Sequence, residues 1–287
     1  MNVLVLGTFD GVHLGHRYLL EYAQGKGNVI ACSFLLPPAA VKGEVKAITT
    51  AAEKTALLKK YGADEVFLQD FAAVCSLSAE EYLEQICKNF KPEYIVIGVD
   101  HRFGKGAQGN AKTLIKNEEK YGYKTVIVPP KVDEQGIISS SSIRALIANG
   151  EIQAANKRLG HAYFISGTVV KGKAIGSTLN FPTANIEFDA QKLLCKNGVY
   201  ATKTLIDGRL YNSMTNVGFN PTVLGEKLTV ETHIFNFSNR IYDKKIKIYF
   251  YSFVREDKKF DSVSELKKQL ENDALLINTY LNTKNKN

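Results

Sequence analysis

The sequence predicts two domains of different classes: an α/β domain with a parallel, Rossmann-like sheet, and an antiparallel β-barrel that ends in a helix. The chain has 287 residues, about twice the usual length of a single domain. Short apolar runs alternate with helical patterns as far as residue 158, which predicts a parallel sheet. From about residue 160, strands follow one another across turns, which is typical of a barrel. We therefore expect domains at residues 1–158 and 159–287.

Apolar runs and helix caps place the elements of the first domain. Two capping boxes, in which a hydroxyl and a carboxylate each accept a backbone amide hydrogen, mark helix starts at Thr50 with Glu53 and at Ser78 with Glu81. A further short helix is expected at about residues 142–148, ending near Gly150. The expected strands are residues 3–6, 29–34, 66–68, 94–97 and 125–128.

The second domain shows strand patterns and one strong hairpin signal. Asp207-Gly208 separates two of these patterns and favours a tight two-residue turn. Ser262 and Glu265 form a capping box for a final helix, whose apolar residues recur at roughly helical spacing and are expected to pack on the barrel. The expected strands are residues 199–206, 210–217, 228–237 and 246–254.

Composition limits the class of protein. Hydrophobic residues make up 45% of the chain and charged residues 23%, which indicates a folded protein. The first residues form no secretory signal and no stretch is apolar enough to span a bilayer, so we expect a cytoplasmic location and no membrane partner. The four cysteines show no C-x-x-C spacing, which supports neither disulfides nor structural zinc.

The positive charge is concentrated in the second half. The formal net charge is +8, and after Arg158 Lys and Arg outnumber Asp and Glu by 18 to 12. Such an excess can attract polyanionic substrates or nucleic acid, or it can be an ordinary solvated face. Charge alone leaves these alternatives open.

A polar, glycine-containing turn follows the first strand and opens a helix. It begins after Gly7 and reads Thr8-Phe9-Asp10-Gly11-Val12-His13-Leu14-Gly15-His16. The carboxyl end of a parallel strand is where α/β sheets bind ligands, and a helix N-terminus offers free amides to phosphate. The two histidines, three apart, share one helix face and can stabilise charge on a transferring phosphate. Zinc binding by these histidines is an alternative, but no third ligand is evident.

These residues carry a resemblance to a known family. H-x-G-H after a first strand is the signature of the nucleotidylyltransferase superfamily. The longer G-x-F-D-G-V-H-x-G-H resembles the bacterial bifunctional riboflavin kinase/FMN adenylyltransferases. The resemblance implies that the first domain transfers AMP from ATP to FMN. It implies catalytic roles for His13, His16 and Arg144, and ATP binding by Gly7, Thr8, Phe9, Asp10, Gly15, Asp100, Ser140 and Ser141.

In the first domain, three segments depart from the family pattern. In the segment that resembles G-x-D-F-R-F-G, Asp100 matches but His101 replaces the usual Phe, and we interpret His101 as a neighbour rather than a catalyst. In the segment that resembles S-S-T-x-I-R, Ser141 replaces Thr and keeps the hydroxyl. The common F-x-P-H-P segment appears as Phe34-Leu35-Leu36-Pro37-Pro38 and lacks its histidine, which bears on the efficiency of adenylylation.

A second group of residues resembles the flavokinase pattern. A glycine-spaced ribbon precedes Pro182-Thr183-Ala184-Asn185, and spacing alone makes this a weak signal. P-T-A-N resembles the flavokinase motif, which implies that Thr183 and Asn185 bind magnesium together with ATP. The same resemblance implies that Glu231 is the general base toward the 5′-hydroxyl of riboflavin and that Arg255 contacts the flavin. The ATP-covering glycines are expected to be Gly167, Gly172 and Gly176.

Together these patterns predict a bifunctional enzyme of FAD biosynthesis. Its expected substrates are riboflavin, FMN and ATP, its expected cofactor is Mg²⁺, and no nucleic-acid partner is expected. The sequence does not indicate an oligomeric state. One alternative is an RNA-binding or RNA-acting nucleotidyl transferase, because barrels often bind single strands. Another is a flavin-binding protein that retains only the kinase step. A G-x-G-x-x-G match at residues 104–109 lies too far beyond its strand for a dinucleotide fingerprint.

Overall fold

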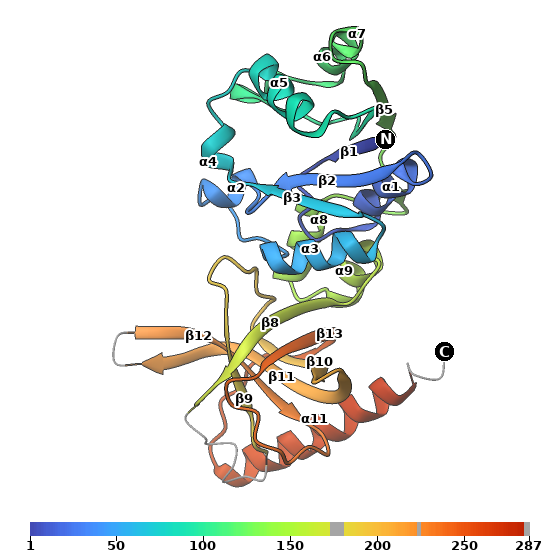
Figure 1. The fold of residues 1–287 in the computed structure, drawn as a ribbon. Helices are drawn as coiled ribbons and strands as arrows, with labels where there is room; N and C mark the ends of the chain where they lie inside the picture. Colours follow the sequence, from blue (N-terminus) through green and yellow to red (C-terminus); the bar gives the residue numbers. More distant parts are fainter. Residues whose placement is uncertain (173–180, 223–224, 284–287) are drawn as a thin grey trace. The chain divides into compact units, whose positions relative to one another are not determined.

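The chain folds into two compact units, Met1–Ser142 and Ile143–Asn287, in a computed structural model that describes residues 1–172, 181–222 and 225–283 (Figure 1). The predicted functional boundary at residues 158 and 159 stays a prediction. Side chains of residues 220–227 are not described either.

The first unit is built on a five-stranded parallel sheet, as predicted. Its order is β3-β2-β1-β4-β5, so the chain winds outward in one direction from β1 and then in the other from β4. This reversal leaves a crevice at the carboxyl ends of β1 and β4, the usual ligand position in such sheets. The strands are β1 (Asn2–Leu6), β2 (Asn28–Phe34), β3 (Glu65–Gln69), β4 (Tyr94–Gly98) and β5 (Lys124–Val128).

Helices cover the sheet, and both predicted capping boxes in this unit are present. Thr50 and Glu53 exchange bonds of 3.3 and 3.0 Å, and Ser78 and Glu81 exchange bonds of 3.2 and 2.8 Å. The helical segments are α1 (Leu14–Ala23), α2 (Pro38–Val41), α3 (Ala51–Lys60), α4 (Phe71–Val74), α5 (Ala79–Phe90), η1 (Lys105–Ala107), α6 (Ala111–Lys116) and α7 (Glu118–Tyr121). A small hairpin joins β6 (Val132–Asp133) to β7 (Gly136–Ile137).

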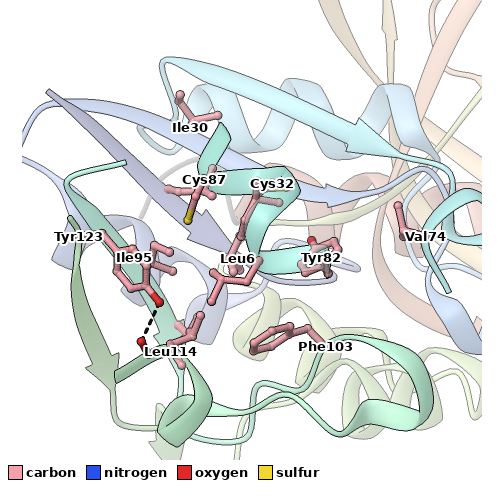
Figure 2. Packing of buried hydrophobic residues seen from close by; sticks show 14 residues of the cluster. Leu6, Ile30, Cys32, Val74, Tyr82, Cys87, Ile95, Phe103, Leu114 and Tyr123 are labelled. Atoms are coloured by element: carbon pink, nitrogen blue, oxygen red, sulfur yellow. Dashed lines mark hydrogen bonds between the residues drawn. The ribbon is translucent and has the colours of Figure 1, made fainter. Parts of the chain in front are cut away.

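Alternate side chains of the strands build one apolar core beneath α5 (Figure 2). Leu6 and Ile95 come from neighbouring strands and meet Tyr82 and Cys87 of α5. Tyr123 is also part of this cluster, and its hydroxyl donates to the Leu114 carbonyl at 2.7 Å. This packing fixes the strand ends that carry the polar residues described below.

The second unit contains the predicted closed antiparallel barrel. Its order is β10-β11-β12-β9-β8-β13. Asp207 and Gly208 have φ angles of 47° and 81° between the paired residues Ile206 and Arg209, so the two-residue hairpin is confirmed. The strands are β8 (Tyr163–Val170), β9 (Ala184–Phe188), β10 (Gly198–Ile206), β11 (Arg209–Thr222), β12 (Gly225–Ile234) and β13 (Lys245–Arg255).

The described part of the chain contains three further helices. The long α11 (Val263–Thr283) is capped by the Ser262 hydroxyl, and its buried Ile277 and Leu281 pack on barrel residues, as predicted. The helix α8 (Ser140–Ala148) starts two residues earlier than the sequence predicts. The helix α9 (Ile152–Leu159) was not predicted, and it packs on β8 and β13.

Candidate functional site

A cavity of about 730 Å³ opens in the first unit at the carboxyl ends of β1 and β4. It lies at the point where the strand order reverses, and it brings together most of the predicted residues of this domain. The predicted residues that line it are Gly7, Thr8, His13, Gly15, His16, Asp100 and Ser140. Phe9, Asp10, Ser141 and Arg144 do not line it.

The turn after β1 has an unusual backbone. Phe9, Gly11 and Val12 have φ angles of 49°, 84° and 42°, and a positive φ is costly for a β-branched residue such as Val12. Phe9 is fully buried, and a Cβ added to Gly7 would come within 3.1 Å of its ring. The Phe9 ring meets the His16 ring edge-on at 5.1 Å. Gly7 and Phe9 therefore position His16.

Asp10 does not line the cavity but holds together the segments that surround it. Its carboxylate accepts hydrogen bonds from the backbone amides of Ile48 and Thr49 at 3.2 and 3.1 Å and is 1% exposed. Its backbone carbonyl accepts the Ser140 hydroxyl at 2.8 Å. Asp10 thus holds the segment before α3 and the start of α8 against the turn. ATP binding by Asp10 stays a prediction.

His13 and His16 form a stacked pair at the start of α1. Their ring centroids are 3.6 Å apart and the ring planes differ by 21°. His13 is the N-cap residue, and its Nδ1 accepts the backbone amide hydrogen of His16 at 3.4 Å. A neutral His13 with an accepting Nδ1 carries its proton on Nε2.

Burial keeps His16 neutral. Its pKa lies well below the ordinary value of 6.5, because the ring is buried and because His13 and Lys54 add positive potential. Its Nδ1 is buried without a hydrogen-bond partner among the described residues. The pair is therefore suited to donate hydrogen bonds rather than to carry two positive charges.

Lys54 is a residue of this site that the sequence did not reveal. It is fully buried, and its ammonium group donates to the Phe34 carbonyl at 2.6 Å. Burial lowers its pKa to about 8, although nearby Asp10 acts in the opposite direction. Lys54 thereby fixes the end of β2 and places positive charge behind His16.

The serine run at the start of α8 also stabilises the beginning of this helix, in addition to its predicted role in ATP binding. Ser139 and Ser142 bond each other across the helix start, with the Ser142 amide donating to the Ser139 hydroxyl at 3.2 Å. Ser140 lines the cavity and Ser141 is exposed. Arg144 lies one turn further along α8 and is half-buried. The roles of Ser141 and Arg144 stay predictions.

Other residues that line the cavity were not among the predicted site residues. Gly104 and Gly106 line it, although their segment carries no dinucleotide fingerprint. Phe34 and Pro38 line it too, so the segment that lacks the family histidine still borders the cavity. The aromatic side chains of Tyr82 and Phe103 and the ring of His101 also line this wall.

The barrel carries a second polar cluster, centred on Glu231 of β12. The Thr183 hydroxyl donates to its carboxylate at 3.2 Å. In the sheet register Glu231 pairs with Asn185 on one side and with Asn216 on the other. Thr183 also lines a cavity of about 210 Å³. The structure thus brings together Glu231, Thr183 and Asn185, which are distant in sequence.

Glycines of the ribbon before this cluster allow close packing. A Cβ at Gly172 would collide with the side-chain amide of Asn185, and one at Gly167 would collide with the Glu187 carbonyl. Gly172 therefore helps to set the Asn185 side chain. Gly176 lies outside the described residues.

Arg255 ties the end of β13 to α11. Its guanidinium pairs with Asp273 at 2.8 and 2.9 Å, and Asp273 is 4% exposed and also accepts from Gln269 at 2.8 Å. The third guanidinium nitrogen, Nη1, donates to the Glu256 carbonyl at 2.9 Å. Flavin contact by Arg255 stays a prediction.

The chain matches two protein-family models, FAD synthetase over residues 1–142 and riboflavin kinase over residues 159–281. A Bacillus subtilis bifunctional riboflavin kinase/FMN adenylyltransferase is 34% identical, over 95% of this chain and 90% of its own length. The chain belongs to this bifunctional family. An Escherichia coli K12 protein of the same name is 32% identical, again over 95% of this chain and 90% of its own.

Membership of the riboflavin kinase/FMN adenylyltransferase family confirms the predicted transferase class and its place in FAD biosynthesis. The RNA-acting alternative and the kinase-only alternative gain no support. A crystal structure described as a macrolide-efflux protein from Streptococcus pneumoniae has the same fold, with a TM-score of 0.85 and 33% identity over 96% of this chain and 93% of that one. Among the residues described here, no helix is long and apolar enough to span a bilayer.

Gly172→Ala should weaken the riboflavin kinase reaction. The added Cβ displaces the Asn185 amide, and a displacement of about 1 Å at a reacting site lowers rates by about tenfold or more. We expect a fall of about tenfold in kcat/KM for ATP, measured as FMN formation. In the matched variant Gly98→Ala the Cβ meets open space in the other unit, so kinase activity should not change. Equal activity of Gly172→Ala and wild type would contradict this role of Gly172.

The first unit should lose stability in mild acid. Burial lowers the pKa of His16 well below 6.5 and that of His101 to about 4. Below pH 6.5 these histidines bind protons in the unfolded chain but not in the folded one, so the free energy of unfolding falls between pH 6.5 and about 4. Thermal unfolding at pH 7.5 and 5.0 should show a smaller decrease in Tm for His101→Phe than for wild type. An equal decrease would exclude His101 as a cause.

Proposed function

We propose that FMN is adenylylated in the cavity of the first unit and that riboflavin is phosphorylated at the Glu231 cluster of the barrel. The observation that carries this proposal is the meeting of His13, His16, Asp100 and Ser140 in one cavity where the strand order reverses. These residues come from three separate segments of the chain. Family membership supplies the two reactions that are assigned to the two units.

In the first reaction, an FMN phosphate oxygen attacks the α-phosphorus of ATP and the bond to pyrophosphate breaks. Charge builds on phosphate oxygens, so hydrogen-bond donors are what this step requires. His13 Nε2 donates one bond, and the amides at the start of α1 and the hydroxyl of Ser140 are further donors beside it. His16 stacks on His13 and holds its ring in place. No protein nucleophile is needed.

In the second reaction, Glu231 accepts the proton of the riboflavin 5′-hydroxyl as that oxygen attacks the γ-phosphorus of ATP. ADP leaves, and FMN is the product. The hydroxyl of Thr183, 3.2 Å from the carboxylate, keeps Glu231 oriented. A half-buried carboxylate beside a hydroxyl is a reasonable base for this role.

The residues present fit magnesium bound together with ATP. Mg²⁺ prefers a few protein oxygens combined with phosphates and waters. The Thr183 hydroxyl and the Asn185 amide oxygen supply such ligands close to Glu231. Bound Mg²⁺ would neutralise phosphate charge. We further propose a cytoplasmic protein that acts on small molecules without a nucleic-acid partner.

Labelled ATP tests both assignments in one protein. With riboflavin as substrate, label from the γ-phosphate should appear in FMN, and label from the α-phosphate should appear only in FAD. Omission of Mg²⁺ should stop both transfers. FAD without label from the α-phosphate would contradict adenylyl transfer, and FMN without label from the γ-phosphate would contradict the kinase reaction.

A further inference from the structure

His101 presents an unsatisfied polar atom at the wall of the larger cavity. The residue lines the cavity and is half-buried, but its Nε2 is buried and has no hydrogen-bond partner in the described parts of the chain. Nearly all buried polar groups in proteins are hydrogen-bonded, so each exception needs an explanation. A ligand that enters the cavity can supply the missing partner.

The ring of His101 is held in place by its surroundings. The backbone amide of His101 donates to the Gly98 carbonyl at 3.0 Å, which fixes the residue at the end of β4. Its ring stacks on Phe103, with centroids 6.0 Å apart and planes 24° apart. Phe103 lies in turn against Tyr82 at 5.8 Å (Figure 2). Because the packed core supports Phe103 and Tyr82, the imidazole is held at the cavity wall by its neighbours, and a small rotation of the ring is enough to turn Nε2 toward a ligand.

The cavity wall around His101 differs in chemical character from the side of the cavity where the phosphates are proposed to bind. His13, His16 and Ser140 offer donors beside a helix N-terminus, whereas His101 lies in a row with two aromatic rings. Burial and neighbouring Arg102 lower the pKa of His101 to about 4, so the ring is neutral at pH 7 and does not bind phosphate as a cation. Aromatic faces beside a neutral nitrogen suit a planar heteroaromatic ring with polar atoms on its edge.

We propose that His101 Nε2 hydrogen-bonds the polar edge of the heteroaromatic ring bound in this cavity, either the flavin of FMN or the adenine of ATP, and so determines substrate specificity. The proposal rests on the assignment of adenylylation to this cavity. The family motif that this segment resembles has Phe at the position of His101. Phe retains stacking but has no ring nitrogen, so this chain has an interaction that the motif lacks.

His101→Phe is the decisive variant, because it keeps an aromatic ring and removes only the polar edge. We expect KM for one of the two adenylylation substrates, FMN or ATP, to rise about tenfold, the effect of one lost hydrogen bond in a buried site. The kcat should stay within about twofold, since phosphate chemistry takes place elsewhere in the cavity. His101→Asn should recover part of the affinity, because it restores a polar side chain.

The substrate whose KM rises identifies the ring. Direct titration of FMN without ATP, followed by flavin fluorescence, separates the two cases: weaker FMN binding by His101→Phe assigns the flavin, and unchanged FMN binding with a raised KM for ATP assigns adenine. Thermal unfolding of the first unit at a Tm close to that of wild type serves as the folding control, because His101 lies in that unit.

Unchanged KM values for both substrates would overturn the proposal, whether or not kcat falls. Failure of the cavity assignment itself has a different readout, namely FAD formation that persists after replacement of His13 and His16.

Discussion

Glu231→Gln should lower the rate of FMN formation from riboflavin by about 10³-fold, within the range expected for loss of a general base. Gln is nearly isosteric and can still accept a hydrogen bond from the Thr183 hydroxyl, so the local geometry should survive. Conversion of supplied FMN to FAD should be unchanged, because that reaction uses residues of the other unit. The two rates are measured separately, with riboflavin or FMN as the starting flavin.

A neighbouring carboxylate supplies the control. Glu187 is exposed on β9, two residues beyond Asn185, and Glu187→Gln makes the same chemical change outside the cluster. It should leave both rates unchanged. If Glu231→Gln slowed both reactions equally, the two sites could not be independent, and the assignment of Glu231 would fail.

Replacement of the stacked histidines should block the other reaction. His16→Ala and His13→Asn should each lower FAD formation from FMN by about 10²- to 10³-fold, which is the usual cost of losing one transition-state donor or its support. His13→Asn is chosen because Asn is a favourable N-cap residue and can still accept the amide of residue 16. Riboflavin phosphorylation should continue, so FMN should accumulate.

The histidine variants also separate folding from chemistry. His13→Asn should unfold at nearly the wild-type Tm, since the helix cap is retained. His161 lies outside the larger cavity, and His161→Ala should not alter FAD formation. A His13→Asn protein with full adenylylation would show that the imidazole of His13 takes no part in the reaction.

Local signals explain why much of the fold was predictable. The five strands of the parallel sheet and the Asp207-Gly208 hairpin depend on short-range apolar patterning and turn chemistry, which a single sequence displays. The capping boxes depend on residues only three positions apart. By contrast, α9 begins at Ile152, and its N-cap residue Glu151 makes no side-chain cap hydrogen bond. This helix is held by distant contacts, such as the hydrogen bond that the Asn156 side-chain amide donates to the Phe250 carbonyl at 2.8 Å.

The same distinction holds for the candidate sites. The turn from Gly7 to His16 is contiguous in the sequence, so a ligand-binding site at this turn could be predicted. Lys54 could not, since a lysine in a helix that also carries Lys59 and Lys60 ordinarily faces solvent. The contacts of Asp10 with residues 48 and 49 likewise depend on how the chain folds back. That the buried Nε2 of His101 lacks a hydrogen-bond partner among the described residues becomes evident only in the folded structure.

The central claim is that one chain carries two independent active sites. A complementation experiment with two variants, each of which lacks one activity, tests this claim most directly. Glu231→Gln alone should leave riboflavin unchanged, and His16→Ala alone should stop at FMN. The two together, incubated with riboflavin, ATP and Mg²⁺ and followed by chromatography of the flavins, should yield FAD, because FMN released by one protein is used by the other. A mixture that still produced no FAD, although each variant retained its remaining activity, would contradict the claim.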